Sequence, residues 1–262
     1  ALPVDAGSAE RQPDGYQQSA RPRGTEECCM GTYVVTGSAS GMGHAAAERL
    51  RLVGHSVIGV DIKDADVRAD LSTAQGRRAA SEAVLQRCSG ALDGAVLAAG
   101  LGPVPGRDHL IAQVNYFGVV DLLTALRPAL GRTGAAKVVV VASNSTTVTP
   151  LVPRRAIRAL LASDPDRALR AVRRFGKRSA PMIYAASKIA VARWVRRQAV
   201  SREWAGLGIR LNAIAPGAVM TPLLAEQLAD PTEAKAIDAF PVPIGGFGDP
   251  GHLADWMVFM LS

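Results

Sequence analysis

The fold is indicated most clearly by residues 33–43, which read Tyr33-Val34-Val35-Thr36-Gly37-Ser38-Ala39-Ser40-Gly41-Met42-Gly43. The first four have the composition of a short buried strand, and residues 44–53 have helical composition. A strand, a glycine turn and a helix in this order place backbone N–H groups and the positive end of a helix against a pyrophosphate. The spacing is T-G-x-x-x-G-x-G instead of the better-known G-x-G-x-x-G, so the turn alone is also compatible with a simple tight connection.

An acidic residue ends the second predicted strand. Residues 56–60 are mostly apolar, and Asp61 follows them, 18 residues beyond Gly43. A carboxylate in this position suits the ribose hydroxyls of NAD and repels the additional phosphate of NADP. We therefore expect NAD as the cofactor, with NADP as the weaker candidate.

Strand-like and helix-like segments alternate from residue 32 onward. Strands are expected near 32–36, 56–60, 92–98, 137–142 and 208–214, and helices near 42–53, 73–88, 107–130, 182–205 and 250–261. This alternation predicts an α/β fold of the Rossmann type, a doubly wound parallel sheet flanked by helices. Ligands of such sheets bind beyond the carboxyl ends of the strands.

Tyr184 and Lys188 lie four residues apart in a segment of helical composition. This spacing puts the phenol and the ammonium on one face of a helix, one turn apart. A nearby ammonium lowers the pKa of a phenol, and such a phenol can give a proton to a carbonyl oxygen or take one from an alcohol. Because an isolated Y-x-x-x-K pair is more often structural than catalytic, the assignment depends on the other motifs.

Together, these residues resemble the short-chain dehydrogenase/reductase family from about Thr32 onward. The resemblance is carried by motifs that stand in order along the chain: Thr36-Gly37-Ser38-Ala39-Ser40-Gly41-Met42-Gly43, Asp61, Asp70-Leu71, Ala98-Ala99-Gly100, Asn115, Ser143, Tyr184, Lys188, Asn212-Ala213-Ile214-Ala215-Pro216-Gly217 and Thr221. Within the family, the chain is most similar to the bacterial 3α-hydroxysteroid dehydrogenase/carbonyl reductase type, through residues 61–67, 69–74, 99–103, 114–118, 212–218 and 221–224. The resemblance implies an NAD-dependent oxidoreductase that interconverts a secondary alcohol and a ketone or aldehyde, with a hydroxysteroid or another bulky apolar carbonyl compound as the leading substrate class.

The resemblance also implies catalytic roles for four residues. Tyr184 would be the general acid and base, Lys188 would lower its pKa and hold the nicotinamide ribose, and Asn115 would help to pass protons through water to Lys188. Ser143 would orient the substrate oxygen; Ser145 is an alternative two residues on, but the predicted strand leads directly into Ser143. Without the family, Asn115 would be interpreted as a helix-interior amide satisfied by the backbone.

By the same resemblance, the cofactor would be bound by the glycine turn and the strand ends. The residues expected to bind it are Gly37, Ser38, Ala39, Ser40, Gly41, Met42, Gly43, Asp61, Ile62, Asp70, Leu71, Ala99, Gly100, Tyr184, Lys188, Pro216, Gly217, Val219 and Thr221. Asp61 would hold the adenosine ribose, and Asp70 and Leu71 would flank the adenine. One departure is Ala98, which stands where the family usually has an asparagine.

About 40 residues separate Ser143 from Tyr184, more than in most family members. Composition predicts a helical insert at about 150–181, with helices over 154–161 and 166–175. Basic side chains gather there: Arg154, Arg155, Arg158, Arg167, Arg170, Arg173, Arg174, Lys177 and Arg178. Many family members associate through the Tyr/Lys helix, so an insert before it leads us to expect a homodimer. The last strand of the family's sheet is expected to be missing after residue 262.

Composition sets the remaining expectations. Residues 1–29 are rich in Gly, Pro, Gln, Ser and charge and are interpreted as a disordered extension or tag, and residues 30–262 as a single dinucleotide-binding catalytic domain. No apolar run reaches about 18 residues, and three cysteines form no disulfide or metal framework. These features favour a cytoplasmic protein that acts on a small molecule, with no membrane, nucleic-acid or metal partner.

Two alternatives stay open. A net charge of +7, with arginine supplying 25 of the 30 basic residues, is interpreted as a solvated surface, but it also permits nucleic-acid binding through the arginine-rich segment. A non-catalytic nucleotide-binding regulator of the same fold is the other alternative. The complete set of Ser143, Tyr184 and Lys188 argues against it, because a binding protein has no use for a tuned phenol.

Overall fold

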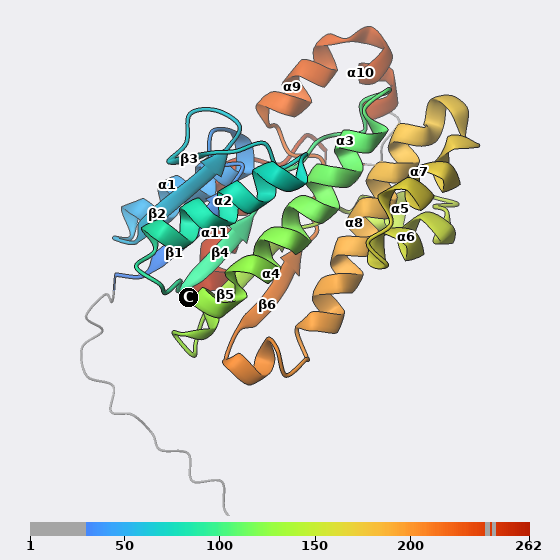
Figure 1. Ribbon diagram of the computed structural model, residues 1–262. Coiled ribbons are helices and arrows are strands. Elements are labelled where there is room, and N and C mark those ends of the chain that lie inside the picture. The colour runs from blue at the N-terminus through green and yellow to red at the C-terminus, as the bar shows by residue number, and fades with distance from the viewer. Residues whose placement is uncertain (1–29, 239–241, 243–244) are drawn as a thin grey trace, which may run out of the picture.

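The predicted parallel sheet is confirmed by a computed structural model, which describes residues 30–238, 242 and 245–262. The extension predicted at 1–29 lies outside the described residues. Six strands form one sheet in the order β3-β2-β1-β4-β5-β6, with every pair parallel. Their bounds are Thr32–Thr36 (β1), Ser56–Asp61 (β2), Val67–Arg68 (β3), Gly94–Leu97 (β4), Lys137–Val141 (β5) and Arg210–Ile214 (β6). Because all strands run in one direction, their carboxyl ends meet at one edge of the sheet (Figure 1).

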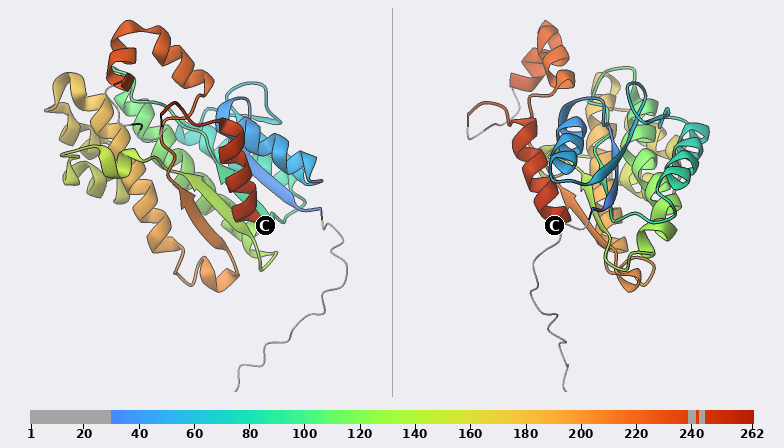
Figure 2. Two further views of the ribbon diagram at one scale, coloured as in Figure 1. Left: turned by 180° about the vertical axis from the view of Figure 1, so that it is seen from behind. Right: turned by 90° about the vertical axis from the view of Figure 1, so that its left-hand side faces the viewer.

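Helices cover both faces of the sheet (Figure 2). One face is covered by α1 (Gly41–Leu52) and α11 (Pro250–Leu261), and the other by α2 (Ala74–Arg87), α4 (Gly118–Gly131) and α8 (Ser179–Gln198). The alternation of side chains explains this division. In β5, Val138 and Val140 pack in the core of the second face, whereas Val139 and Val141 pack against the first. A continuous apolar run is therefore buried on both sides, as expected of an inner strand.

The single helix predicted over 107–130 is wrong in one respect. The chain forms α3 (Asp108–Ala112), then a π-helical turn, η1 (Gln113–Phe117), and then α4. A π-helical turn contains one more residue than an α-helical turn, and such turns are frequent at functional sites. The run 108–131 is long and apolar enough to cross a membrane, but 61% of its most apolar window is buried inside the protein, so it is a core helix of this fold.

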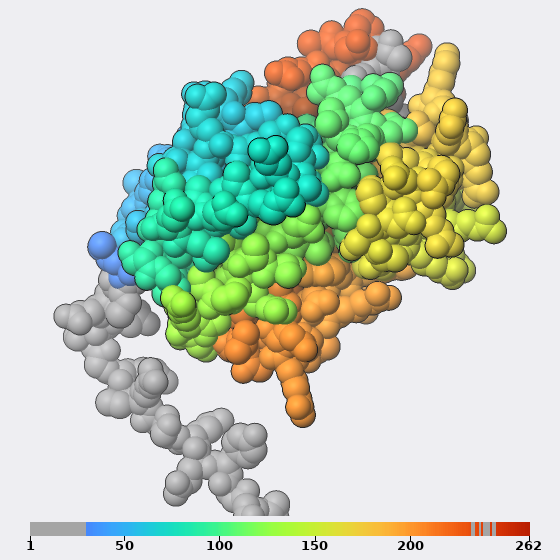
Figure 3. All heavy atoms as spheres, in the orientation of Figure 1, coloured from blue at the N-terminus to red at the C-terminus, as the bar shows by residue number. Residues whose placement is uncertain are grey.

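The two helices predicted in the 150–181 segment are present as α6 (Arg154–Leu161) and α7 (Pro165–Arg173). The Asp164 side chain caps α7 by accepting a hydrogen bond from Arg167 N at 2.8 Å. The apolar sides of α6 and α7 are buried in the same core as α8, and all nine basic side chains of the segment are exposed. Figure 3 shows the surface of α6 and α7 beside α3, which α7 contacts.

Several short elements were not predicted, among them β3, α5 (Ser145–Val148), η2 (Gly176–Arg178), η3 (Ala205–Leu207), α9 (Pro222–Ala229) and α10 (Pro231–Asp238). The helix expected at 182–205 begins earlier, at Ser179, and ends at Gln198. Among the described residues, no strand follows β6 in the sheet. The expected loss of a last strand stays a prediction.

Candidate active site

The glycine turn between β1 and α1 depends on the absence of side chains. Gly37 and Gly41 have φ angles of +71° and +58°, in the left-handed region that favours glycine. A Cβ at Gly43 would collide with the carbonyl oxygen of Gly37. The first turn of α1 can therefore approach the end of β1 closely, and its N-terminal N–H groups stay near the carboxyl edge of the sheet.

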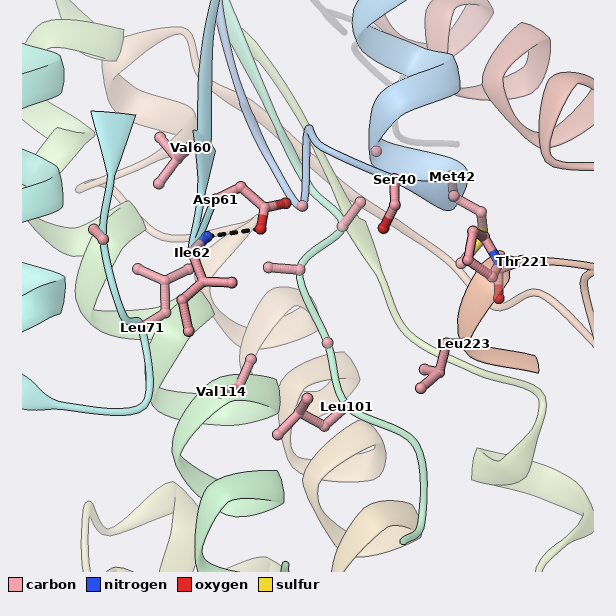
Figure 4. A pocket seen from close by; sticks show the side chains of 18 of the residues that line it. Ser40, Met42, Val60, Asp61, Ile62, Leu71, Leu101, Val114, Thr221 and Leu223 are labelled. Atoms are coloured by element: carbon pink, nitrogen blue, oxygen red, sulfur yellow. Dashed lines mark hydrogen bonds between the residues drawn. The ribbon is translucent and has the colours of Figure 1, made fainter. Parts of the chain in front are cut away.

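Asp61 joins this turn to the end of β2. Its Oδ2 accepts a hydrogen bond from Ala39 N at 3.0 Å, and its Oδ1 accepts one from Ile62 N at 2.7 Å. Figure 4 shows the carboxylate between the glycine turn and the end of β2. The carboxylate that we expect to bind a ribose therefore also holds the turn in place.

A pocket of about 250 Å³ opens at this edge of the sheet. Its lining includes most of the predicted cofactor residues: Gly37, Ser40, Gly41, Met42, Gly43, Asp61, Ile62, Asp70, Leu71, Ala99, Gly100 and Thr221. It also includes residues that were not predicted: Val60, Ala69, Ala98, Leu101, Val114, Pro222 and Leu223. Most of these are the immediate neighbours of predicted residues along a strand end or loop, so proximity in the sequence could have indicated them. Val114, too, is the neighbour of a predicted residue, Asn115.

The pocket has the features that a dinucleotide needs. Its glycine turn offers backbone N–H groups without obstructing side chains, and Asp61 offers a carboxylate for hydroxyl groups. Ile62, Leu71 and Val114 supply apolar surface beside that carboxylate for a flat ring (Figure 4). On the far side, a Cβ at Gly41 would lie 3.2 Å from the methyl carbon of Thr221, so the start of α9 closes over the turn.

The other predicted cofactor residues do not line this pocket. Ser38 is buried, and its Oγ lies close to Gly59 of β2, whereas Ala39 contributes its N–H to Asp61. The carbonyl oxygen of Pro216 accepts a hydrogen bond from Asn144 N at 2.8 Å, which brings the loop after β6 beside the loop after β5. Gly217 and Val219 continue that loop, and Val219 forms a single β-bridge with Gly248.

Lys188 is fixed at the end of β5. Its Nζ donates a hydrogen bond to the carbonyl oxygen of Val141 at 2.8 Å, and the side chain is only 6% exposed. Burial penalises the charged ammonium and lowers the pKa of Lys188 to about 8. A Cβ at Gly100 would lie 3.6 Å from this Nζ and 3.3 Å from the Oδ1 of Asn115, so the three residues lie together.

The expected effect of Lys188 on Tyr184 is wrong in this structure. Burial raises the pKa of Tyr184, and a hydrogen bond with the Ser143 side chain opposes that rise. The ammonium of Lys188 donates its hydrogen bond to the carbonyl oxygen of Val141. The phenol therefore stays protonated at neutral pH.

The two candidate serines differ in their contacts. Ser143 Oγ accepts a hydrogen bond from Ser145 N at 3.1 Å and is the side chain that pairs with Tyr184. Ser145 Oγ is buried without a hydrogen-bond partner. These contacts favour Ser143 as the functional serine. Its catalytic role stays a prediction.

Asn115 is fully buried in the π-helical turn η1, where both ends of its amide pair with the backbone of Leu101. Leu101 N donates to Asn115 Oδ1 at 2.8 Å, and Asn115 Nδ2 donates to Leu101 O at 3.0 Å. The hydrogen bonds of this amide are therefore made with backbone, as expected for Asn115 if the family resemblance is set aside. The backbone belongs to a loop 14 residues away in the chain. It holds the loop after β4 against the helix layer beside Lys188 and Gly100. A role in proton transfer stays a prediction.

Within the described part of the chain, no group of three or more His, Cys, Asp or Glu side chains could hold a metal ion.

Comparisons with known proteins agree with this geometry. A family model described as enoyl-(acyl carrier protein) reductase matches residues 169–262. The 3-alpha-hydroxysteroid dehydrogenase/carbonyl reductase of Comamonas testosteroni is 39% identical over 89% of this chain and 90% of its own length. A crystal structure of the 3-alpha-hydroxysteroid dehydrogenase from Pseudomonas sp. B-0831, complexed with NADH, superposes with a TM-score of 0.81. The two sequences are 42% identical, and the match covers 88% of this chain and 89% of that one. Levodione reductase superposes with a TM-score of 0.65 at 27% identity, over 88% of this chain and 90% of that one.

The buried ammonium of Lys188 predicts a pH-dependent stability. Between about pH 8 and pH 10 the folded chain has released a proton that the unfolded chain still binds, so the free energy of unfolding should rise with pH. Lys188→Met should remove this rise. From pH 8 to pH 9.5, the free energy of unfolding of the wild type should therefore increase by about 1–2 kcal/mol relative to that of the variant. Urea unfolding of the cofactor-free protein at each pH measures it. The raised pKa of Tyr184 has the opposite sign but acts only above pH 10.

The exposed residue Lys63 provides the control: Lys63→Met should leave the pH dependence of the wild type unchanged. Parallel stability curves for the wild type and Lys188→Met would contradict the assignment of a lowered pKa to Lys188.

Proposed function

Because this chain belongs to the short-chain dehydrogenase/reductase family, we propose that it is an NAD-dependent oxidoreductase that interconverts a secondary alcohol and a ketone or aldehyde. The observation that carries the proposal is the convergence of three side chains at the carboxyl edge of the sheet. Tyr184 pairs with Ser143, and Lys188 is fixed to Val141 two residues before Ser143. The pocket formed by the glycine turn and Asp61 lies at the same edge.

When bound, NADH supplies a hydride, and the protein supplies position and a proton. Ser143, with its oxygen already accepting from Ser145 N, has its own proton free to donate to a substrate oxygen or to Tyr184. Tyr184 is protonated at neutral pH, so its hydroxyl can donate a proton to a carbonyl oxygen that gains negative charge. Lys188 is held near Asn115 and Gly100, where its ammonium can hold a ribose hydroxyl.

A hydroxysteroid or another bulky apolar carbonyl compound is the substrate class that we propose. The support comes from the two steroid-dehydrogenase relatives, which match most of this chain at 39% and 42% identity. The proposed site for the cofactor comprises the pocket-lining residues of the glycine turn, Asp61 and Leu71, with Pro216, Gly217 and Val219 toward the nicotinamide end. The non-catalytic regulator has no observation in its favour, since the set of Ser143, Tyr184 and Lys188 is complete.

The protein is further proposed to be a cytoplasmic homodimer that has no nucleic-acid or membrane partner. Self-association is supported by two large apolar side chains on the outer side of α11. Trp256 and Phe259 are 60% and 69% exposed and pack edge to face with ring centroids 6.1 Å apart. Adjacent exposed aromatic side chains of this size are typical of surfaces that become covered.

The first functional prediction concerns the proton donor. Tyr184→Phe keeps the ring and removes the hydroxyl, so ketone reduction with NADH should slow by at least about 10²-fold, the usual loss for a general acid. Binding of NADH, measured by fluorescence titration, should change little. Tyr33→Phe is the matched control, because Tyr33 lies near the amino end of β1, at the opposite edge of the sheet. Substantial reductase activity in Tyr184→Phe would show that Tyr184 is not the acid.

The second prediction concerns the choice between NAD and NADP. Asp61→Asn removes the negative charge but keeps an oxygen that can accept from Ala39 N or Ile62 N. The preference for NAD, measured as the ratio of kcat/KM for the two cofactors, should narrow by about 10-fold or more, a change of about 1.4 kcal/mol. Asp64→Asn, an exposed position in the next loop, should leave the ratio unchanged. A wild-type preference for NADP would contradict the role of Asp61.

The third prediction concerns assembly. Light scattering should give twice the chain mass of 27.4 kDa for the wild type. Trp256→Glu, which places a charge on the exposed side of α11, should shift the protein toward the monomer without lowering its thermal stability. A wild-type protein that stays monomeric at high concentration would overturn the homodimer.

A further inference from the structure

Arg77 is a buried arginine on α2, only 6% exposed, and lies outside the residues assigned to catalysis or cofactor binding. We infer that Arg77 is a positioning residue that holds the wall of the dinucleotide pocket formed by Leu71 and Val114. This inference rests on the proposed function, because the wall matters only if a dinucleotide occupies the pocket.

The guanidinium contacts three separate parts of the chain. Its Nε donates to Asp121 Oδ2 on α4 at 2.8 Å. Its Nη1 donates to the carbonyl oxygen of Leu71 at 3.0 Å and to Gln113 Oε1 at 3.0 Å. The same group lies over the ring of Phe117, 5.7 Å from its centroid. One rigid fork therefore joins the loop before α2, the π-helical turn η1 and the start of α4.

These contacts end on residues that shape the pocket. Leu71 lines it directly, and Gln113 immediately precedes Val114, which lines it on the same side as Leu71 (Figure 4). The next residue, Asn115, pairs with the backbone of Leu101, which also lines the pocket. Arg77 thus fixes one wall through Leu71 and the start of η1, and η1 fixes the loop after β4.

Stability alone does not explain a buried arginine at this position. Removing a cation from water is expensive, and buried ion pairs can often be replaced by apolar residues without loss of stability. The planar fork of arginine can bind several acceptors at fixed angles, which a lysine ammonium on a flexible stem cannot reproduce. The arrangement of Leu71, Gln113 and Asp121 around one guanidinium therefore points to geometry as its role.

By the family resemblance, Leu71 flanks the adenine, so the effect of Arg77 should fall on the adenosine end of the cofactor. Loss of the fork should let Leu71 and Val114 shift within this wall and weaken binding of the dinucleotide. The reacting groups, Tyr184 and Lys188, are held by other contacts, on α8 and at the end of β5. Turnover at saturating NADH should therefore persist.

The test uses the full chain with Arg77→Met, Arg77→Lys and Gln113→Leu, the last of which removes a single contact. Arg78→Met is the matched control, because Arg78 is the exposed neighbour on the same helix. Dissociation constants for NADH and for ADP-ribose, which lacks the nicotinamide, are measured by calorimetry. Each variant's Tm and its kcat and KM for NADH are measured alongside.

We expect Arg77→Met and Arg77→Lys to weaken the binding of NADH at least about 10-fold and the binding of ADP-ribose by the same factor. The kcat of these variants should change less than about 3-fold. Gln113→Leu should show a smaller loss in the same direction, and Arg78→Met none. Three outcomes would overturn the inference: unchanged NADH affinity in folded Arg77 variants, a loss for NADH without one for ADP-ribose, or a fall in kcat as large as the loss in affinity. If the wild type itself binds no NADH, the proposed function fails. If the wild type binds NADH and folded Arg77 variants bind it equally well, only the inference about Arg77 fails.

Discussion

The hydrogen bond from the Lys188 ammonium to the carbonyl oxygen of Val141, 2.8 Å long, ties α8 to the carboxyl end of β5. It fixes the register of the helix against the strand, and thereby brings Tyr184 of α8 to Ser143, two residues beyond Val141. The cost of this arrangement is the burial of an ammonium, whose pKa falls to about 8. This contact therefore lies beside the proposed reacting groups.

A second constraint, the parallel direction of all six strands, brings the dinucleotide pocket to the same edge of the sheet as Ser143 and Lys188. The glycine turn after β1, Asp61 after β2 and Gly100 after β4 then share one edge with Ser143 after β5. Contacts between these loops keep the edge in shape. Asp61 accepts from Ala39 N, and Asn115 holds Leu101 on the other side.

The strands and the glycine turn could be predicted from the sequence, because their signals are local: apolar β-branched runs, and glycines at Gly37, Gly41 and Gly43, where the structure leaves no room for a Cβ at Gly43. The π-helical turn could not, since nothing local in the sequence interrupts the helix predicted over 107–130, and the contact of Asn115 within the turn is to Leu101, 14 residues away. Arg77 was missed because a lone arginine on a predicted helix is usually exposed. The predicted direction of the pKa shift of Tyr184 was wrong. The spacing places Lys188 near a phenol, but it does not show that the ammonium donates its hydrogen bond to a backbone carbonyl oxygen.

The central claim is that this edge of the sheet transfers hydride between NADH and a carbonyl carbon, with Tyr184 giving the proton. The most direct measurement uses NADH carrying deuterium at C4 of the nicotinamide and a panel of ketosteroids and aromatic aldehydes, with mass spectrometry of the product alcohols. The account predicts one deuterium on the carbinol carbon of at least one substrate, from one face of the nicotinamide only. Tight binding of NADH with no deuterium transferred to any carbonyl compound of the panel would contradict it, and would leave a nucleotide-binding protein without turnover.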